Sequence, residues 1–484
     1  MEINYDKYEA VIGLEVHAQL STQTKAFSPD PYEYGTAPNT QVGDVSMAHP
    51  GTLPRPNIEA LKYAVKMGIA TASEIHPYTF YSRKNYFYPD LPKGYQITQY
   101  KNPICTGGRV TINQADGGTR DIRLDKIILE EDSGKSIHDI DPFFSLVDLN
   151  RAGVPLIEIV TEPDLRLPEE AYQYLMEIRK MVRYLDICDG NMEEGSLRCD
   201  ANVSVRLKGS EVLNEKVEIK NMNSMRNVQR AIAYEIKRQI EAVEKGEAIR
   251  ALTMGFDPVN GQTFEMRSKE AENDYRYFPE PDIPPTQLEE GYVERIKAAM
   301  PALPRERMKH YVENMKLSPY DAEILAEERS FADFFEAVVQ NGKHYKAAAN
   351  WMNGPVRSFL NKEALSIKDF PVSASHLAEL VALSESDQIS FSVASQQLFP
   401  ALIQNPEANP QKMAEELNLI QIGDEAFLEE VIAEVIASFP EKVKDYQNGK
   451  KGLLGMFMGQ VMKKTKGKAD PKKANQLLAR ALQN

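Results

Sequence analysis

Apolar and polar residues alternate along several runs in the first part of the chain. In residues 14–20, four aliphatic side chains alternate with those of Glu15, His17 and Gln19. Since successive side chains of a β-strand point to opposite faces, this spacing predicts a strand with one apolar and one polar face. The same pattern predicts strands at 197–207, 216–220 and 263–269, and two further strands that carry acidic residues at 127–132 and 156–162.

Helical spacing interrupts the strand pattern twice and replaces it after about residue 285. One helix is predicted after Pro168, and another begins after Ser224 and stops before Gly246. Two of the later helices are expected to begin at Ser318-Pro319 and at Asp470-Pro471. Proline fits the first turn of a helix, so each pair is a start signal. A break between helices is expected near 405–410.

These patterns predict an α+β protein with three parts. A mostly antiparallel sheet domain with flanking helices is expected over 1–290, a helical connector domain over 291–405, and a small helical tail domain over 406–484. The tail is basic, since residues 441–484 contain 11 Lys and Arg against 3 Asp and Glu. This composition favours nucleic acid as a partner, although a solvated helix face has the same composition.

Composition narrows the classes of partner and site. The formal net charge of −14 excludes a uniformly basic coat for nucleic acid. The three cysteines are scattered and form no CxxC pair, which argues against a disulfide scaffold and against a cysteine-bound zinc ion. No run approaches the roughly 20 apolar residues of a membrane span, so we expect a cytoplasmic protein without a membrane partner.

The polar faces of the predicted strands form the candidate functional surface. A polar strand face often meets only water, and for any single strand this explanation is sufficient. Several of these strands, however, gather carboxylates, a histidine and guanidinium groups at short spacing. Carboxylates bind magnesium, and arginine and lysine stabilise a transferred phosphoryl group, so the set favours an ATP and Mg²⁺ site. Because the sequence has no Walker A motif, such a site would lie on an open sheet face.

Phrases along the whole chain resemble the B-subunit family of tRNA-dependent amidotransferases, which includes the archaeal E subunit. The most specific phrases are GLEVH at 13–17, YPDLPKGYQ at 88–96 and YRYFPEPD at 275–282. The resemblance implies a catalytic sheet similar to that of glutamine synthetase and the guanido kinases. It also implies that the C-terminal residues 452–478 belong to the small tail domain of the family.

The resemblance implies roles for particular residues. Metal binding is expected at Glu15, His17, Glu130, Glu131, Glu158 and Asp200. Catalysis is expected to depend on Glu15, His17, Glu130, Asp200 and Lys220. Contacts to phosphate or carboxylate are expected from Arg198, Ser204, Arg206, Lys220 and Arg276. Lys84, Tyr88 and Lys93 are candidates for contact with the acceptor end of tRNA by charge and stacking, although core packing also explains the aromatic residues of this segment.

One departure from the family concerns zinc. Many relatives carry two cysteine pairs that hold zinc on either side of the phrase APNTQV, which stands here at 37–42. The matching stretches of this chain, at 26–35 and 43–51, contain no cysteine, so no zinc is expected. We expect packing to hold this loop instead, with Pro29, Pro31 and Pro50 restricting the backbone.

The resemblance implies an ATP- and Mg²⁺-dependent activity. The chain would phosphorylate the side-chain carboxylate of Glu-tRNA(Gln) or Asp-tRNA(Asn), and ammonia from a glutaminase A subunit would then form the amide. A small C subunit would complete the heterotrimer. Two alternatives remain at this stage, namely a tRNA-binding scaffold without chemistry of its own and a free-standing ligase that acts on a small amino acid.

Overall fold

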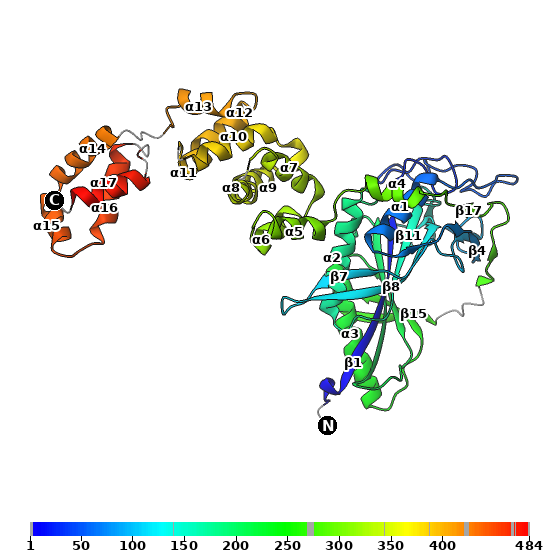
Figure 1. Ribbon diagram of the computed structural model, residues 1–484. Helices are drawn as coiled ribbons and strands as arrows, with labels where there is room; N and C mark the ends of the chain where they lie inside the picture. The colour runs from blue at the N-terminus through cyan, green and yellow to red at the C-terminus, as the bar shows by residue number, and fades with distance from the viewer. Residues whose placement is uncertain are drawn as a thin grey trace. The chain divides into compact units, whose positions relative to one another are not determined.

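The computed structural model describes residues 3–138, 140–268, 275–342, 344–386, 388–420, 425–465, 469 and 471–482. The chain divides into two compact units, Met1–Leu303 and Pro304–Asn484 (Figure 1). The first unit combines a large sheet with helices, and the second unit is helical in its described part. Within the described residues, no helix has both the length and the apolar character needed to cross a bilayer.

A ten-stranded sheet dominates the first unit. Its strands follow the order β15-β14-β13-β12-β1-β11-β8-β6-β2, and β7 pairs with β8. Among the described strands every pairing is antiparallel except that of β13 with β14. The longer strands are β1 (Tyr8–Gln19), β7 (Arg109–Asn113), β8 (Thr119–Glu131), β11 (Pro155–Thr161), β12 (Leu197–Leu207), β13 (Val217–Met222), β14 (Leu252–Asp257) and β15 (Gln262–Ser268).

Short strands complete the first unit. They are β2 (Glu74–Ile75), β3 (Tyr78–Thr79), β4 (Ser82–Asn85), β5 (Tyr95–Thr98), β6 (Cys105–Thr106), β9 (Lys135–Ile137), β10 (Leu146–Asp148), β16 (Phe278–Pro279) and β17 (Thr286–Gln287). All six strands predicted from alternation are confirmed, with ends that differ from the expected ones by at most eight residues, although residue 269 lies outside the described residues. The prediction of a mostly antiparallel sheet is also confirmed.

Helices cover the apolar face of the sheet, where α2 and α3 lie against the strands (Figure 1). They are α1 (Ile58–Ala70), α2 (Pro168–Tyr184), α3 (Met225–Glu244) and α4 (Tyr292–Ala299). The predicted starts of α2 and α3 are confirmed, and the Ser224 side chain caps α3 by accepting from the Asn227 amide. Helix α1 was not predicted from the sequence, although Asn57 caps it and Leu61, Ala64, Val65 and Gly68 have helical spacing on its buried side.

Strand register decides which polar residues become neighbours. β1 lies between β11 and β12, and its partners opposite His17 are Glu158 and Arg198. Glu15 lies opposite Asp200. Directly opposed residues of antiparallel strands point to the same face, so these side chains share the face that the helices leave uncovered.

The second unit contains helices α5 to α17. Their bounds are α5 (Pro304–Glu313), α6 (Pro319–Leu325), α7 (Arg329–Val339), α8 (Tyr345–Trp351), α9 (Arg357–Glu363), α10 (Ala374–Glu385), α11 (Phe391–Val393), α12 (Phe399–Gln404), α13 (Pro410–Glu416), α14 (Glu425–Ser438), α15 (Pro440–Gln447), α16 (Leu453–Lys464) and α17 (Pro471–Ala481). The predicted starts at Pro319 and Pro471 and the break near 405–410 are confirmed, while Asp470 lies outside the described residues.

Two separate apolar cores lie in the second unit. One surrounds the buried Trp351 and extends from Tyr311 to Leu419, and the other extends from Leu428 to Leu482. Helix α13 contributes Met413 and Ala414 to the earlier core. The sequence predicted that the tail domain begins at residue 406, yet α13 packs with the helices before it. The first unit likewise continues through α4 to Leu303, beyond the predicted edge at 290.

Candidate active site

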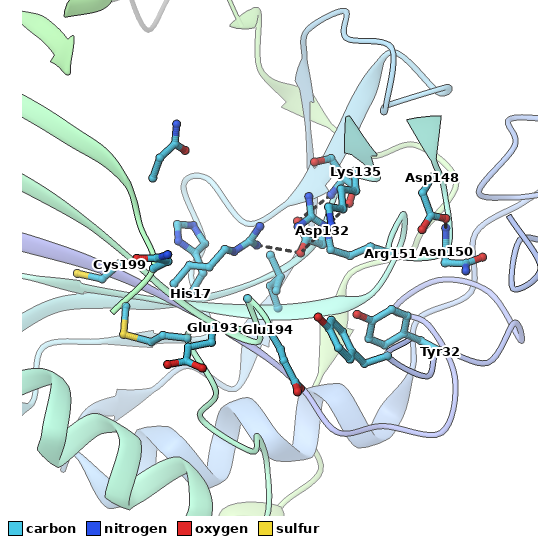
Figure 2. Close-up of a pocket in the computed structure, with 18 of the residues that line it drawn as sticks. His17, Tyr32, Asp132, Lys135, Asp148, Asn150, Arg151, Glu193, Glu194 and Cys199 are labelled. Atoms are coloured by element: carbon cyan, nitrogen blue, oxygen red, sulfur yellow. Dashed lines mark hydrogen bonds and ion pairs between the residues drawn. The ribbon is translucent and has the colours of Figure 1, made fainter. Parts of the chain in front are cut away.

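A cavity of about 710 Å³ opens on the polar face of the sheet (Figure 2). Its walls come from β1, β4, β8, β12 and β13 and from the loops around 32–36, 148–151 and 192–195. Basic and acidic side chains both line it. The basic residues are Lys84, Lys135, Arg151, Arg198 and Lys220, and the acidic residues include Glu130, Asp132, Asp148 and Asp200.

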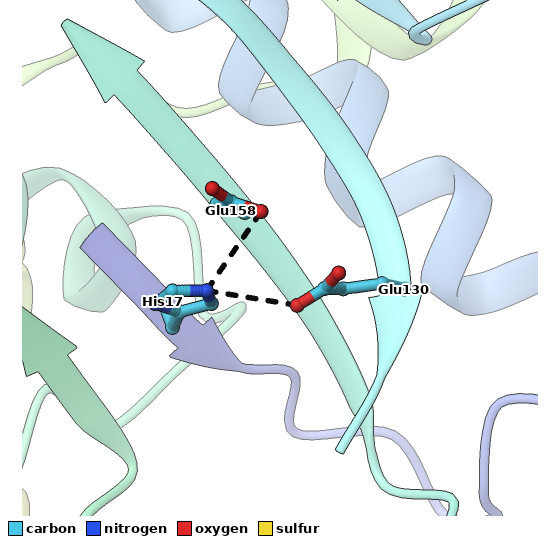
Figure 3. A group of neighbouring side chains, drawn as sticks. All are labelled: His17, Glu130 and Glu158. Carbon is cyan, nitrogen blue, oxygen red and sulfur yellow. Dashed lines mark ion pairs between the residues drawn. The ribbon is translucent and has the colours of Figure 1, made fainter. Parts of the chain in front are cut away.

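The first cluster of possible metal ligands contains His17, Glu130 and Glu158 (Figure 3). The His17 Nε2 atom lies 3.6 Å from Glu130 Oε1 and 3.8 Å from Glu158 Oε2. Burial, helped by the positive charge of Arg198, lowers the pKa of His17 to about 3, so the imidazole is neutral and has a free lone pair at neutral pH.

The two carboxyls of this cluster lack a full counter-charge. Burial and the nearby carboxylates of Glu130 and Glu15 raise the pKa of Glu158 to about 8. Burial also raises the pKa of Glu130, against the opposing effect of Lys84. A bound cation would favour the ionised form of both groups, so the cluster has the charge that a divalent ion requires.

The second cluster contains Glu15, Asp200 and Glu218, whose ligand oxygens lie within 4.8 Å of one another. Lys220 is the counter-ion of this group, because its Nζ donates to Asp200 at 2.6 Å and lies 3.2 Å from Glu218. Although burial opposes the charge on Lys220, the two carboxylates raise its pKa. Asn202 also donates to Glu15 Oε1 at 2.8 Å.

The donors of both clusters fit a divalent cation. Magnesium prefers carboxylate oxygens and water, which the all-carboxylate cluster and the cavity can supply. The cluster around His17 adds one imidazole nitrogen, a ligand that manganese and zinc also accept. The two groups are adjacent because Glu15 and His17 alternate with Val16 along β1. The residues present are therefore suited to one or two divalent ions on the same sheet face.

A guanidinium pair borders the clusters. Asp132 accepts from Arg198 Nη2 at 2.9 Å and from Gln19 Nε2 at 3.0 Å, and it lies 3.5 Å from Arg151. Figure 2 shows Asp132 at the cavity, where dashed lines mark its hydrogen bonds and ion pairs. Burial would raise the pKa of Asp132, but the two guanidinium groups outweigh it and lower that pKa. Because Asp132 is ionised, it holds Arg198 in position beside His17.

Lys84 brings a further cation to the cavity. Its Nζ lies 4.8 Å from the ring centre of Tyr275 and 6.0 Å from that of Tyr86. Lys84 and Tyr86 line the cavity. Aromatic faces attract an ammonium group without neutralising it, so Lys84 remains available to an anionic ligand.

Glu131 and Lys93 lie away from the cavity. Glu131 follows Glu130 in β8 and therefore points to the opposite, apolar face of the sheet. There it forms a buried ion pair with Lys93 and accepts from the Ile97 amide at 2.9 Å. The structure thus separates Glu131 from the metal-binding groups. It gives Lys93 a carboxylate partner in the interior, while Tyr88 is exposed and does not line the cavity.

Three predicted phosphate contacts also lie outside the cavity. Ser204 lines a separate cavity of about 460 Å³ and donates to the Asn214 carbonyl at 2.9 Å. Arg206 donates to Glu9 at 2.7 Å. Arg276 borders another cavity, of about 360 Å³, with Tyr100 and Tyr277. The predicted residues that do gather around the main site are Glu15, His17, Lys84, Glu130, Glu158, Arg198, Asp200 and Lys220.

Three residues of the site were not predicted from the sequence. Asp132 shares its strand face with Glu130, two residues earlier, and Glu218 shares a face with Lys220. The alternation pattern could have identified both. Arg151 lies in a turn before β11. In a turn, the spacing of apolar and polar residues does not indicate where a side chain points.

Hydrogen bonds hold the loop around residues 37–42, the segment in which many relatives are expected to bind zinc and this chain is not. Asn39 donates to the Val147 carbonyl at 2.9 Å and accepts from the Leu149 amide at 2.8 Å. Asn150 donates to Ala37 at 2.8 Å and accepts from Gln41 at 2.9 Å. The sequence predicted packing and prolines in this role. The amide bonds tie the loop to residues 147–150, which include part of the cavity wall.

We expect Asn39→Ala to loosen this loop. Asn39 has a φ of 59°, a left-handed conformation that asparagine tolerates better than alanine, and the variant also loses two hydrogen bonds. Cleavage within residues 30–50 by a dilute protease should become roughly tenfold faster. Asn39→Gly keeps the backbone conformation accessible and should show a smaller increase. Equal cleavage rates of the wild-type chain, Asn39→Ala and Asn39→Gly would contradict the assigned role of Asn39.

Comparisons with known proteins identify the family of the chain. Residues 10–294 match the family model described as the GatB/GatE catalytic domain, and residues 333–482 match the GatB domain. A relative from Synechococcus sp. (strain JA-3-3Ab), named as the B subunit of aspartyl/glutamyl-tRNA(Asn/Gln) amidotransferase, is 49% identical over 98% of both chains. A relative of the same name from Thioalkalivibrio sulfidiphilus is 47% identical over 99% of this chain and 100% of its own. Another, from Salinibacter ruber, is 45% identical over 99% of this chain and 97% of its own. The resemblance inferred from the sequence phrases is confirmed, and the chain belongs to the GatB/GatE family.

Proposed function

We propose that this chain is the B subunit of a tRNA-dependent amidotransferase. It binds Glu-tRNA(Gln) or Asp-tRNA(Asn), phosphorylates the side-chain carboxylate with ATP, and presents the product to ammonia. The observation that carries the proposal is that two clusters of possible metal ligands both contribute to the cavity that Lys84, Arg198 and Lys220 line. The resemblance to the sheet of glutamine synthetase, which the sequence phrases imply, supports a nucleotide site on the open polar face of this sheet.

ATP is needed because ammonia cannot displace hydroxide from a carboxylate at a useful rate. In the first step, a carboxylate oxygen of the aminoacyl group attacks the γ-phosphorus of ATP and ADP leaves. In the second step, ammonia attacks the acyl carbon, phosphate leaves, and the nitrogen loses a proton to solvent or phosphate. Positioning and charge stabilisation supply most of the acceleration in such transfers.

The cations of the cavity have complementary roles. Arg198 lies opposite His17 and is oriented by Asp132, so it is placed to hold the substrate carboxylate or the γ-phosphate. Lys84 approaches from β4 and Lys220 from β13, which places ammonium groups on different walls of the same cavity. Together they would stabilise the negative charge that develops on the transferred phosphoryl group.

Magnesium would be held by Glu15, Asp200 and Glu218 and by His17, Glu130 and Glu158, and when bound it would neutralise phosphate charge and align the nucleotide. Lys220 occupies the position of a counter-ion in the all-carboxylate cluster. We propose that Lys220 turns toward the phosphates when a divalent ion enters, because the ion then takes over its carboxylate partners.

Ammonia and tRNA would reach the chain through other parts of the assembly. We propose that a glutaminase A subunit supplies ammonia and that a small C subunit joins the two, as the family resemblance implies. A closed path for ammonia would also protect the acyl phosphate from water. The basic segment 441–484 would contact the tRNA backbone.

A reconstituted complex of the three subunits tests the proposal. With ATP, Mg²⁺ and glutamine, it should convert Glu-tRNA(Gln) or Asp-tRNA(Asn) to the amidated form and release one ADP for each amide. A scaffold without chemistry would bind tRNA and leave ATP intact. Amidation of free glutamate by the isolated chain would point to a ligase for a small amino acid instead. Either of these results would overturn the proposed function.

A further inference from the structure

A cavity of about 360 Å³ lies beside the small three-stranded sheet of the first unit, which has the order β16-β4-β5 and is separate from the ten-stranded sheet. Its volume lies in the range of small-ligand pockets. Four aromatic and two basic residues line it, and we call it the aromatic cavity. The aromatic residues are Phe80, Tyr100, Tyr277 and Phe278, and the basic residues are Lys101 and Arg276.

The aromatic rings of this cavity are partly open to solvent. Phe80, Tyr100 and Tyr277 are half-buried, and Phe278 is 44% exposed. Tyr100 and Tyr277 stack on each other, with ring centres 4.1 Å apart and planes that differ by 5°. Large apolar side chains that stay exposed around a cavity are typical of binding sites. A parallel pair of rings is suited to a further flat ring, and every nucleobase offers a flat face.

Two cations at this cavity are available to an anion. Lys101 and Arg276 are exposed, and neither forms an ion pair with another residue in the part of the chain that the structure describes. Arg276 has a φ of 42°, a left-handed backbone that is uncommon for a residue with a β-carbon. The Asn85 amide holds this turn, because it donates to the carbonyls of Tyr275 at 3.1 Å and of Arg276 at 2.8 Å. A strained backbone that neighbouring groups hold in place is common at ligand sites.

A row of tyrosines connects the aromatic cavity to the main cavity. The ring centre of Tyr277 lies 6.0 Å from that of Tyr275, which lies 6.4 Å from that of Tyr86. Tyr86 lines the main cavity together with Lys84, whose Nζ lies over the Tyr275 ring. Stacked nucleotides advance roughly 3.4 Å each along a strand, and extended nucleotides advance farther. Only a few nucleotides would therefore span the distance between the two cavities.

We propose that the aromatic cavity binds an unpaired base of the tRNA acceptor end, upstream of the terminal aminoacylated adenosine. The base stacks on the wall that contains Tyr100 and Tyr277, and Lys101 and Arg276 contact the phosphates beside it. The inference rests on the proposed function, because it takes the esterified Glu or Asp to lie in the main cavity. An amino acid attached to tRNA reaches that cavity on a single strand, and proteins bind single strands by aromatic stacking and positive charge.

Binding of modified tRNAs to the reconstituted three-subunit complex tests the inference. Each tRNA carries an abasic nucleotide at one unpaired 3′ position upstream of the terminal adenosine. We expect one of them to bind the wild-type complex about tenfold more weakly than intact tRNA, because a stacked base is lost. Tyr100→Leu should weaken binding of intact tRNA by a similar factor, and the abasic change should then cause no further loss. Tyr100→Phe keeps the ring and should bind as the wild type does.

Charge variants provide the second measurement. Lys101→Gln and Arg276→Gln should each weaken binding of intact tRNA and lower the slope of log affinity against log salt concentration by roughly 0.7. Both should bind a tRNA without its unpaired 3′ nucleotides as the wild type does. Lys208→Gln is the matched control, since Lys208 is exposed just beyond β12 and borders none of the described cavities. It should leave both the affinity and the slope unchanged.

The outcomes separate the inference from the proposed function. If the wild-type complex does not amidate misacylated tRNA, the proposed function fails. If it does, but Tyr100→Leu and Lys101→Gln bind intact tRNA as tightly as the wild type, only the inference is overturned. An equal loss of affinity for intact and shortened tRNA would overturn it too.

The same variants test a protein occupant of the aromatic cavity. If Tyr100→Leu and Lys101→Gln are folded in thermal unfolding but fail to join the other subunits, the cavity holds a segment of a partner protein and the inference is overturned. If Tyr100→Leu itself does not fold, the salt dependence of Lys101→Gln still decides the question, because Lys101 is exposed.

Discussion

Glu15→Gln is expected to reduce ATP-dependent transamidation by the reconstituted complex by about 10³-fold or more, while tRNA binding stays unchanged. Glu15 provides one of three carboxylates in the cluster with Asp200 and Glu218, and it anchors Asn202. Glutamine keeps the shape and an oxygen that can accept from Asn202. It removes the negative charge, however, and leaves Lys220 to neutralise the two remaining acids without a metal ion.

The measurement is single-turnover formation of amidated tRNA, accompanied by binding of the misacylated tRNA to the same preparation. Glu265→Gln is the matched control, because Glu265 lies on the same sheet in β15, is exposed, and borders none of the described cavities. It should retain wild-type activity. Retention of more than about a tenth of the activity by Glu15→Gln would show that this carboxylate does not hold a catalytic metal ion.

Removal of all residues after Ile420 is expected to raise the KM for misacylated tRNA by about tenfold or more and to change the KM for ATP by less than about twofold. The basic segment 441–484 carries most of the positive charge of the tail, and phosphate contacts supply much of the affinity for tRNA. The helices beyond residue 425 have their own apolar core. The truncation therefore leaves the core around Trp351 intact, including Met413 and Leu419.

A charge variant of the full chain separates electrostatics from shape. Lys442, Lys444 and Lys463 are exposed, and their replacement by glutamine should weaken tRNA binding and reduce its dependence on salt concentration. A cut after residue 409 should instead destabilise the helical unit, because it removes α13 from that core. Equal effects of the Ile420 truncation on both KM values would contradict a tRNA-binding tail.

Local patterns predicted six of the eight longer strands and the starts of four helices. Alternation located β1, β8, β11, β12 and β13, because each has one buried and one polar face. It also located β15, although the apolar residues of that strand, Phe264 and Met266, are exposed. Proline and serine signals located α2, α3, α6 and α17, because helix starts need particular side chains at their first residues. Helix α1 was missed, since its apolar residues occur in a segment rich in strand and turn signals.

Sequence by itself determined the class of protein, the antiparallel sheet, and the face on which His17, Glu15, Asp200 and Arg198 lie, since a period of two fixes which side chains share a face. Only the tertiary structure decided which of these groups meet. Pairing in the order β12-β1-β11-β8 sets Glu158 and Glu130 beside His17, and the turn before β11 adds Arg151. These partners are far apart along the chain, and long-range strand pairing leaves no local signal in the residues that it joins.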